Sequence, residues 1–501
     1  MLSSDPKAAS VDLAAVCRRA DHLMTTGGYE QAIVAYRQVL DVRPDHAVAA
    51  NNMGNAYQKL GRFTEAVSCY RWARDARPDN AEIRTNLGRA LDASGDPRQA
   101  LEELGVALQL APSSAEIHYH IATLLEHQLF LAEARSYYEA ALRLKPDYPA
   151  ARVGLGDVLA DLGFEDEAWE QRRLGYAERV LLTTPALRND HPVRVLKLMS
   201  AAGGNIPLDA VLTRFRFEVS GLIAEFADRL PPPDGYDTVI NAIGDADRCR
   251  RGLEAAATLL RGASVRVLNP PERVEATGRE ALAERLGGLE GLRTPRVRTL
   301  PRDLFGEGRA AAMLAAEGWR CPLLLRARGY HSGHHFPKVE TFDRVDAAGA
   351  ALPGDQLLAI EWLDSASDDG LFRKYRAMLL DGAVYPLHLA ISRQWKVHYF
   401  SAEMAGSEAH RAEELRYLSD PEGVIGNRAM TALKRISEAL GLDYAGVDFA
   451  LGADGTVLVF EANATMRIVP PPSGPLGDYR RPFIERAMTA ARTLFSGGRT
   501  P

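Results

Sequence analysis

Two carboxylates and an amide are set close together near the C-terminal end of the sequence. The stretch LGLDYAGVDFALGADGTVLVFEANATM predicts a hairpin with strands at 447–451 and 457–462. Side chains alternate along a strand, so Glu461 and Asn463 share one face, and Asp448 lies on the paired strand. Such oxygens suit a magnesium ion that carries phosphates. The other interpretation, an exposed hairpin with a few polar residues, poorly explains acidic residues inside apolar runs such as VLVF.

The D-x-F segment followed by F-E-x-N resembles the metal-binding hairpin of the ATP-grasp superfamily. The resemblance extends upstream to about residue 191. RCPLLLRARGYHSGHHFPKVET resembles that superfamily's central strand, phosphate-covering loop and return strand. LLAIEWLD resembles its adenine-binding strand, and FRKYRAMLLDGAVYPLHLAIS resembles the hairpin that follows. The resemblance implies ATP and Mg²⁺ as cofactors, with Asp448, Glu461 and Asn463 as metal ligands.

The resemblance also implies contacts to the nucleotide. Arg326 stands where the family usually has a lysine before the loop, and Arg279 lies near the place of an earlier lysine. Both substitutions keep positive charge near phosphate, and arginine can bind two oxygens at once. Further ATP contacts are implied on the return strand, the adenine-binding strand and near the ribose: Lys338, Glu361, Leu363, and Asp368 or Asp369.

Ligases of the resembled family activate a carboxylate with ATP, and an amine then displaces phosphate from the acyl phosphate. Arg376 and Arg393 are the candidates for holding the acyl phosphate or the carboxylate. The resemblance therefore implies an ATP-dependent ligase that forms an amide bond. A non-catalytic nucleotide-binding scaffold is the alternative, and phosphotransfer without ligation is a third hypothesis.

The predicted phosphate-covering loop, GYHSGHHF, is rich in histidine. Gly329 and Gly333 supply flexibility and close backbone approach, and His331, His334 and His335 cluster between and beside them. A glycine-flanked lid is a poor place for the fixed geometry that a metal site needs. Contact with phosphate, a plain solvated loop and a transition-metal site all stay open for this segment.

Strands and a helix alternate in the segment before the ATP-grasp resemblance becomes strong. HPVRVLKLMSAAGG, YDTVINAIGDAD and VRVLNPP read as strands, with a helix at 247–261. This alternation predicts a parallel, doubly wound sheet, whose ligands lie at the carboxyl ends of the strands. Residues 200–205, including Asn205, and 241–245 are therefore candidate substrate loops, although plain turns explain them equally well.

The N-terminal part of the sequence repeats with a period of 34 residues. Within each repeat, alanine recurs at one place, a small residue recurs at a second place and a bulky residue recurs at a third. A proline closes each of the first four repeats: Pro44, Pro78, Pro112 and Pro146. Small residues let two helices approach closely, and proline ends the second helix. The pattern resembles the tetratricopeptide repeat and predicts five helix pairs, the fifth without its closing proline.

Arrays of this repeat curve, and the first helix of each pair lines the concave face. Asn51, Asn55, Arg89 and Tyr119 fall at groove-facing places and could grip an extended peptide or a protein partner. The plain interpretation is a solvated face. The repeats could also serve self-association, as in a homodimer. The lysine clamp that some relatives use for a terminal carboxylate is not evident, because Asn51 stands where a lysine would be needed.

Composition limits the remaining possibilities. The 501 residues carry a net charge of −6, which favours neither nucleic acid nor an anionic membrane as partner. Four scattered cysteines fit a reducing cytosol, and no secretory signal or apolar membrane span is evident, so a cytoplasmic protein is expected. A small carboxylate or amine is the expected substrate. The predicted fold is an all-α tetratricopeptide solenoid at 11–182, then an α/β (α+β) ATP-grasp fold with a first domain at 191–272 and a catalytic domain at 273–495.

Overall fold

The computed structural model describes residues 12–187, 191–232, 235–263, 265–327, 335–397, 399, 402–471, 474 and 477–497. The chain divides into two compact units, Met1–Gly175 (unit 1) and Tyr176–Pro501 (unit 2). Each unit is described by itself. The finer division of unit 2 at residue 273 stays a prediction.

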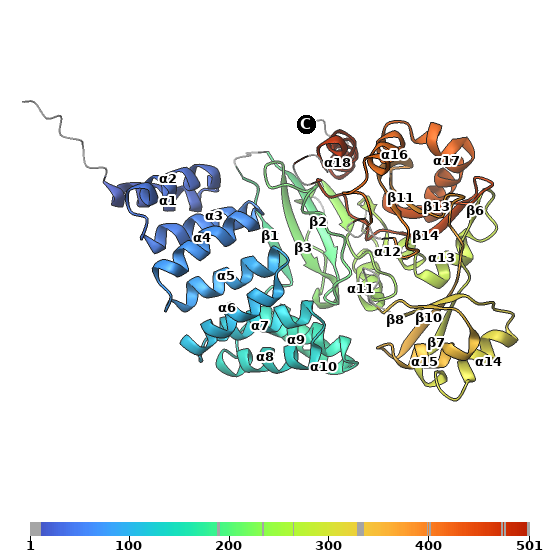
Figure 1. Cartoon of the computed structure of the whole chain (residues 1–501), viewed down its shortest axis with the longest axis horizontal. Helices are drawn as coiled ribbons and strands as arrows, with labels where there is room; N and C mark the ends of the chain where they lie inside the picture. Colours follow the sequence, from blue (N-terminus) through green and yellow to red (C-terminus); the bar gives the residue numbers. More distant parts are fainter. Residues whose placement is uncertain are drawn as a thin grey trace, which may run out of the picture. The chain divides into compact units, whose positions relative to one another are not determined.

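Unit 1 is helical throughout its described part, and its helices pack in consecutive pairs (Figure 1). The ten helices in this part are α1 Leu13–Thr25, α2 Tyr29–Val42, α3 Ala47–Lys59, α4 Phe63–Ala76, α5 Ala81–Ala93, α6 Pro97–Leu110, α7 Ala115–His127, α8 Leu131–Leu144, α9 Pro149–Asp161 and α10 Glu165–Tyr176. The five predicted helix pairs are confirmed.

The close approach of the two helices in a pair depends on small residues. A Cβ atom added at Gly54 would lie 2.7 Å from the Tyr70 ring, and one added at Gly88 would lie 2.7 Å from Leu104. Ala66 and Ala100 are fully buried at the repeated alanine place. The repeat pattern is thus a packing pattern, because any larger side chain at these places would push the helices apart.

Unit 2 begins with a mixed sheet in the order β1-β3-β2-β4-β5. Its strands are β1 Leu181–Thr184, β2 Val193–Met199, β3 Phe217–Ile223, β4 Thr238–Asn241 and β5 Val267–Leu268. The predicted parallel pairing of β2, β4 and β5 is confirmed. The sequence did not predict β3, which runs parallel to β2, or β1, which runs antiparallel to β3. Short helices accompany this sheet: η1 Ala224–Phe226, α11 Arg250–Leu259 and α12 Pro271–Glu275.

The second sheet of unit 2 is antiparallel and has the order β7-β10-β8-β9. Its strands are β7 Val297–Pro301, β8 Leu323–Ala327, β9 Lys338–Val339 and β10 Gln356–Glu361. The neighbouring helices are α13 Arg279–Leu286, η3 Arg302–Leu304, α14 Arg309–Ala316, η4 Phe342–Arg344 and α15 Val345–Ala350. A separate hydrophobic cluster that includes Phe305 and Trp319 packs against this sheet.

The third sheet has the order β12-β11-β13-β14-β6. Its strands are β6 Leu292–Arg293, β11 Phe372–Leu380, β12 Ala383–Ser392, β13 Tyr444–Leu451 and β14 Val457–Asn463, so the two predicted hairpins are confirmed. The remaining helices are α16 Glu408–Ser419, α17 Pro421–Leu440, η5 Asp478–Arg480 and α18 Arg481–Phe495. Tyr375 and Phe449 stack with ring centroids 5.2 Å apart in the core that this sheet shares with α16, α17 and α18.

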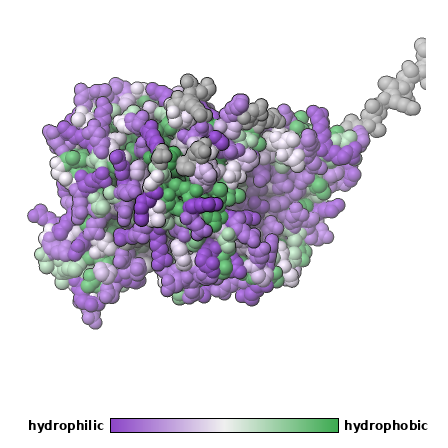
Figure 2. Space-filling view, turned by 180° about the vertical axis from the view of Figure 1, so that it is seen from behind, coloured by the Kyte–Doolittle hydropathy of each residue, from purple (hydrophilic) through white to green (hydrophobic). Residues whose placement is uncertain are grey.

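Hydrophilic residues cover most of the face drawn in Figure 2. Among the described residues, no helix combines the length and the apolar character needed to cross a membrane.

Candidate functional site

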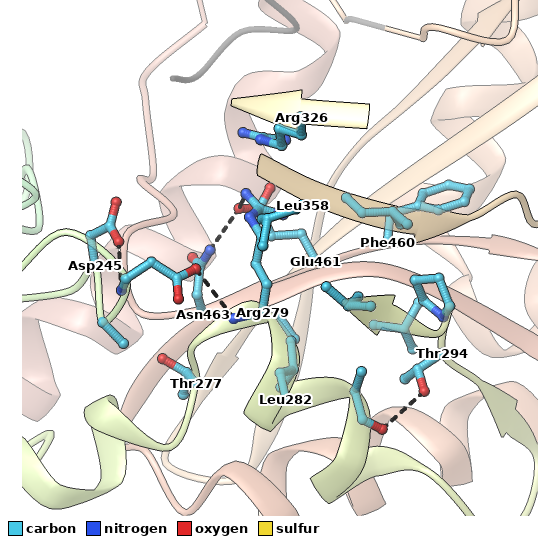
Figure 3. A pocket seen from close by; sticks show the side chains of 18 of the residues that line it. Asp245, Thr277, Arg279, Leu282, Thr294, Arg326, Leu358, Phe460, Glu461 and Asn463 are labelled. Atoms are coloured by element: carbon cyan, nitrogen blue, oxygen red, sulfur yellow. Dashed lines mark hydrogen bonds and ion pairs between the residues drawn. The ribbon is translucent and has the colours of Figure 1, made fainter. Parts of the chain in front are cut away.

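A pocket in unit 2 draws its walls from five stretches of chain that are separate in the sequence (Figure 3). They are the loop after β4, the segment from Thr277 through α13 to β7, the strands β8 and β10, and β14 with the residues after it. One part of the lining is polar: Asp245, Asp247, Thr277, Arg279, Arg326, Glu461, Asn463 and Thr465. The other part is apolar and includes Leu282, Val297, Leu358 and Ile360.

The polar part contains an arginine, a glutamate and an asparagine in direct contact. Arg279, the first residue of α13, donates a hydrogen bond of 2.9 Å from Nη2 to Glu461 Oε1. Asn463 Nδ2 donates a second bond of 2.9 Å to the same oxygen. Burial would raise the pKa of Glu461, but Arg279 and Arg326 outweigh it and lower the pKa, so the carboxylate is ionised at neutral pH.

Arg326 lies on β8, on the strand above Glu461 in Figure 3. Its guanidinium sits over the Phe336 ring, 5.3 Å from the centroid. Burial, followed by the charge of Arg279, lowers the pKa of Arg326 to about 10. The side chain is therefore a cation at neutral pH. Arg279 and Arg326 are the two arginines of a lining that also contains the carboxylates of Asp245, Asp247 and Glu461, and arginine can bind two oxygens of an anion at once.

Asp448 lies directly opposite Glu461 on the paired strand β13, but its carboxylate is engaged elsewhere. Arg376 donates from Nε to Oδ1 at 2.6 Å and from Nη2 to Oδ2 at 2.7 Å, and Lys374 Nζ donates to Oδ2 at 3.1 Å. Although burial opposes ionisation, Lys374 and Arg376 hold the pKa of Asp448 well below its ordinary value. Asp448 is thus a buried anion that is paired with two partly exposed cations.

These groups form one row across the third sheet. Residues directly opposite on paired strands share a face, and the register places His388, Arg376, Asp448 and Glu461 opposite one another in succession on β12, β11, β13 and β14. Burial, followed by Arg376, lowers the pKa of His388, so its ring is neutral. Among the described residues, His388 Nδ1 has no hydrogen-bond partner. The row therefore runs from the buried His388 ring at one end to Glu461, which lines the pocket, at the other.

Of the three predicted magnesium ligands, Glu461 accepts its hydrogen bonds on Oε1, whereas the side-chain oxygens of Asp448 and Asn463 are all engaged within the protein. Magnesium is commonly held by one or two carboxylates together with substrate phosphates, and Glu461 lines the pocket as such a carboxylate. Asn463 lines the pocket beside it, and its Oδ1 accepts from the Thr465 N–H at 3.0 Å and from the Thr465 hydroxyl at 2.8 Å. Both oxygens of Asp448 are already bound to cations. In the part of the chain that the structure describes, no three His, Cys, Asp or Glu side chains are placed to hold a metal ion by themselves.

The residues predicted to contact adenine are engaged in holding strands together. The Glu361 carboxylate accepts bonds from Arg293 Nη2 at 2.6 Å and from the Arg296 N–H at 3.0 Å. The Glu361 N–H donates to the Arg296 carbonyl at 2.8 Å. Leu363 is buried in a cluster with Ala450 and Leu458. Their neighbour Ile360 lines the pocket, so the adenine role of Glu361 and Leu363 stays a prediction.

Three further predicted residues lie outside the pocket lining. Lys338 Nζ lies 3.2 Å from Glu340 and 4.2 Å from the centroid of the Trp362 ring. Asp369 is paired with Arg373, whose hydrogen bonds lower the pKa of the carboxyl to about 2. Arg393 is exposed just after β12. The structure brings Arg279, Arg326, Glu461 and Asn463 to one pocket and leaves these three apart.

The histidine-rich loop and the 200–205 loop were both candidate ligand loops, and the structure describes the contacts of the second. His331 and His334 lie outside the described residues. In the 200–205 loop, the Asn205 carboxamide accepts from the Ser200 N–H at 2.7 Å and donates to the Ser200 carbonyl at 2.9 Å. Asn205 thus closes its own turn, which supports the plain-turn interpretation of that loop.

In unit 1, two of the four predicted groove residues line a shared hollow. Arg89 on α5 and Tyr119 on α7 face it together with Gln58, Asp92, His120 and Thr123. Burial, followed by Arg89, lowers the pKa of His120 to about 4, so Arg89 is the cation of this hollow. Asn51 and Asn55 on α3 bond within the repeats instead, to Asn86 at 3.1 Å and to the Tyr70 hydroxyl at 2.7 Å.

Lys374 and His388 are site residues that were not predicted from the sequence. Lys374 precedes Arg376 by two residues on the same predicted strand, so the alternation of strand side chains would have placed both on one face. His388 offers no comparable signal, because its position opposite Arg376 depends on the register of β11 and β12.

Models of the tetratricopeptide repeat match residues 11–79, 51–115, 85–129 and 119–171, so the N-terminal region contains tetratricopeptide repeats. Such repeats suggest protein–protein interaction or peptide binding. No curated protein matches the sequence.

Several solved structures resemble about a third of the chain. MamA from Desulfovibrio magneticus RS-1 is 18% identical, over 34% of this chain and 98% of its own, with a TM-score of 0.32. YrrB, described as a TPR protein with an unusual peptide-binding site, is 23% identical over 34% and 87%, with a TM-score of 0.29. PilF of Pseudomonas aeruginosa is 23% identical over 33% and 75%, with a TM-score of 0.31.

Proposed function

We propose that unit 2 is an ATP-dependent carboxylate–amine ligase of the ATP-grasp type, and that the repeats recruit its peptide or protein substrate. The observation that carries the proposal is the composition of one pocket. Two arginines, Arg279 and Arg326, face Glu461 and Asn463, and the adjoining wall is apolar. A nucleotide has the matching parts, since its base is flat and weakly polar and its phosphates need cations and a metal.

The chemistry follows from where charge has to be neutralised. A carboxylate oxygen of the substrate attacks the γ-phosphorus, the bond to the β–γ bridging oxygen breaks, and ADP leaves. An amine nitrogen then attacks the acyl carbon, phosphate leaves, and the amine proton passes to solvent. In this proposal Arg279 and Arg326 hold the phosphates, and the apolar wall that includes Leu358 and Ile360 receives the base. Magnesium at Glu461 would supply further neutralisation of phosphate charge.

Nucleotide binding without turnover is the second candidate, and one observation favours it. The carboxylate of Asp448 is sequestered by Arg376 and Lys374, which leaves fewer oxygens for a metal. ADP release by the full chain separates the two. The chain is incubated with MgATP and a panel of carboxylates, each with and without amines and peptides. A ligase releases ADP only with a matched pair and forms a product whose mass shows condensation. Tight ATP binding with no release under any pair would establish the second candidate.

A further inference from the structure

We infer that Asp448 is a positioning residue that holds Lys374 and Arg376 as a paired cation site for the carboxylate substrate, and that it is not a ligand of the metal. The inference rests on the proposed ligase function of the adjoining pocket.

The three side chains lie at different depths below the surface. The Asp448 side chain is 4% exposed, whereas Lys374 is 18% exposed and Arg376 is 27% exposed. The carboxylate thus lies beneath the two cations. A group that approaches this face from solvent meets the ammonium and the guanidinium first. Glu461, by contrast, is 28% exposed and lines the pocket.

The two cations occupy both carboxylate oxygens of Asp448. Arg376 takes one bond to each oxygen of Asp448, and Lys374 takes a further bond to Oδ2. This fork geometry fixes the plane of the guanidinium, and it leaves the second edge of the guanidinium for another anion. Coordination of a metal by Asp448 would break these bonds. It would also leave two unpaired cations beside a divalent ion.

The net charge and the location of this cluster both suit a substrate carboxylate. Two cations and one carboxylate leave one positive charge, which matches a single substrate carboxylate. Asp448 is directly opposite Glu461, so this cation pair adjoins the part of the pocket proposed for the phosphates. A carboxylate held there would lie beside the γ-phosphate, and the cations would offset the repulsion between the two reactants. His388, opposite Arg376 and with an unpartnered Nδ1 among the described residues, adds a buried polar group to the same row.

The test compares Asp448→Asn with Glu461→Gln in the full chain. ADP binding is measured by titration calorimetry over a series of Mg²⁺ concentrations. Glu461→Gln is expected to raise the Mg²⁺ concentration at half-maximal binding by 10-fold or more. Asp448→Asn is expected to change it by less than twofold. An equal shift in both variants would make Asp448 a metal ligand and overturn the inference.

Lys374→Met is a second variant, which decides the question if Asp448→Asn fails to fold. Lys374 is partly exposed, so its replacement is expected to leave the fold intact. If Asp448 only positions the cations, the Mg²⁺ midpoint stays unchanged in Lys374→Met. If Asp448 is a ligand, removal of a competing cation lowers the midpoint, and the inference fails.

Acetate is the probe for the cation pair, because the proposed occupant is a carboxylate and phosphate would also bind Arg279 and Arg326. Its affinity for the full chain, measured by calorimetry with and without MgADP, is expected to fall at least fivefold in Lys374→Met and in Asp448→Asn. Unchanged acetate affinity in both variants would overturn the cation site. If the wild type binds no ADP at any Mg²⁺ concentration, the proposed nucleotide function fails, and the acetate titration without ADP still decides whether Asp448 organises a carboxylate site.

Discussion

Arg279 and Glu461 are 182 residues apart in the sequence, and a hydrogen bond of 2.9 Å joins them. The bond ties the first turn of α13 to the last part of β14, at the centre of the pocket. It also places a cation and an ionised carboxylate side by side, and under the proposed function the first would contact phosphate and the second a metal.

The first prediction concerns this carboxylate. Glu461→Gln keeps an acceptor for Arg279 and loses the negative charge that would hold magnesium, so turnover should fall roughly 10²–10⁴-fold. Thermal unfolding should change little, because the hydrogen bonds persist. Steady-state ADP release at saturating Mg²⁺, with the melting temperature as control, checks both points. Wild-type turnover in this variant would contradict the metal role of Glu461.

The second prediction concerns Arg326. Its lowered pKa of about 10 leaves it charged at pH 7–8, so Arg326→Ala should weaken ATP binding and Arg326→Lys should recover much of it. The competing explanation is a purely structural cation stacked on Phe336. Arg298→Ala is the matched control, because Arg298 is an exposed arginine on β7 of the same sheet and is paired with Glu317. Equal ATP affinity in the alanine, lysine and wild-type proteins would refute the phosphate contact.

The repeats could be predicted because their information is local. Each 34-residue block specifies a helix pair through alanine, glycine and proline at fixed places, and the neighbouring blocks supply the rest of the core. In unit 2 the β13–β14 hairpin was equally local. The edge strand β1 was not predictable, because its four residues LLTT are all exposed and carry no alternating pattern.

The contacts of the site could be predicted only in part. The alternation of side chains brings Glu461 and Asn463 to one face without reference to the rest of the chain. The partners of Asp448 depend on the register between β11 and β13, which are about 70 residues apart. Likewise, the Glu361 N–H is occupied by Arg296 because β10 pairs along β7, and no feature of LLAIEWLD indicates this.

The third prediction concerns the pH dependence of stability in unit 1. Burial, followed by the charge of Asp157, raises the pKa of Glu126 to about 7, although the Tyr138 hydroxyl donates a bond of 2.6 Å to it. The folded state therefore holds this proton more tightly than the unfolded state. Its contribution to stability is full below about pH 4.5 and is lost as the pH rises through 7.

Glu126→Gln should accordingly raise the melting temperature at pH 8 and have little effect at pH 5, because the amide stays neutral and still accepts from Tyr138. Glu133→Gln, at an exposed glutamate on α8, is the matched control and should change neither value. Circular dichroism at 222 nm measures the melting of the helices. A lower melting temperature for Glu126→Gln than for the wild type at pH 8 would show that the ionised Glu126 carboxylate does not destabilise the folded state.

The fourth prediction concerns the hollow between α5 and α7. Arg89 is its cation and Tyr119 its aromatic wall, a combination suited to an acidic or carboxylate-bearing residue of an extended peptide. Peptides selected on the full chain from a random library should bind Arg89→Ala about 10-fold more weakly, since a charge-assisted hydrogen bond contributes ~1.5–3 kcal/mol. Arg98→Ala, at an exposed arginine on α6, should bind them as the wild type does.

ADP binding should be equal in all three proteins, because Arg89 belongs to unit 1 and the pocket is built wholly from unit 2. If the selected peptides bind the Arg89 and Arg98 variants equally well, the hollow does not capture the peptide, and self-association becomes the better explanation of the repeats.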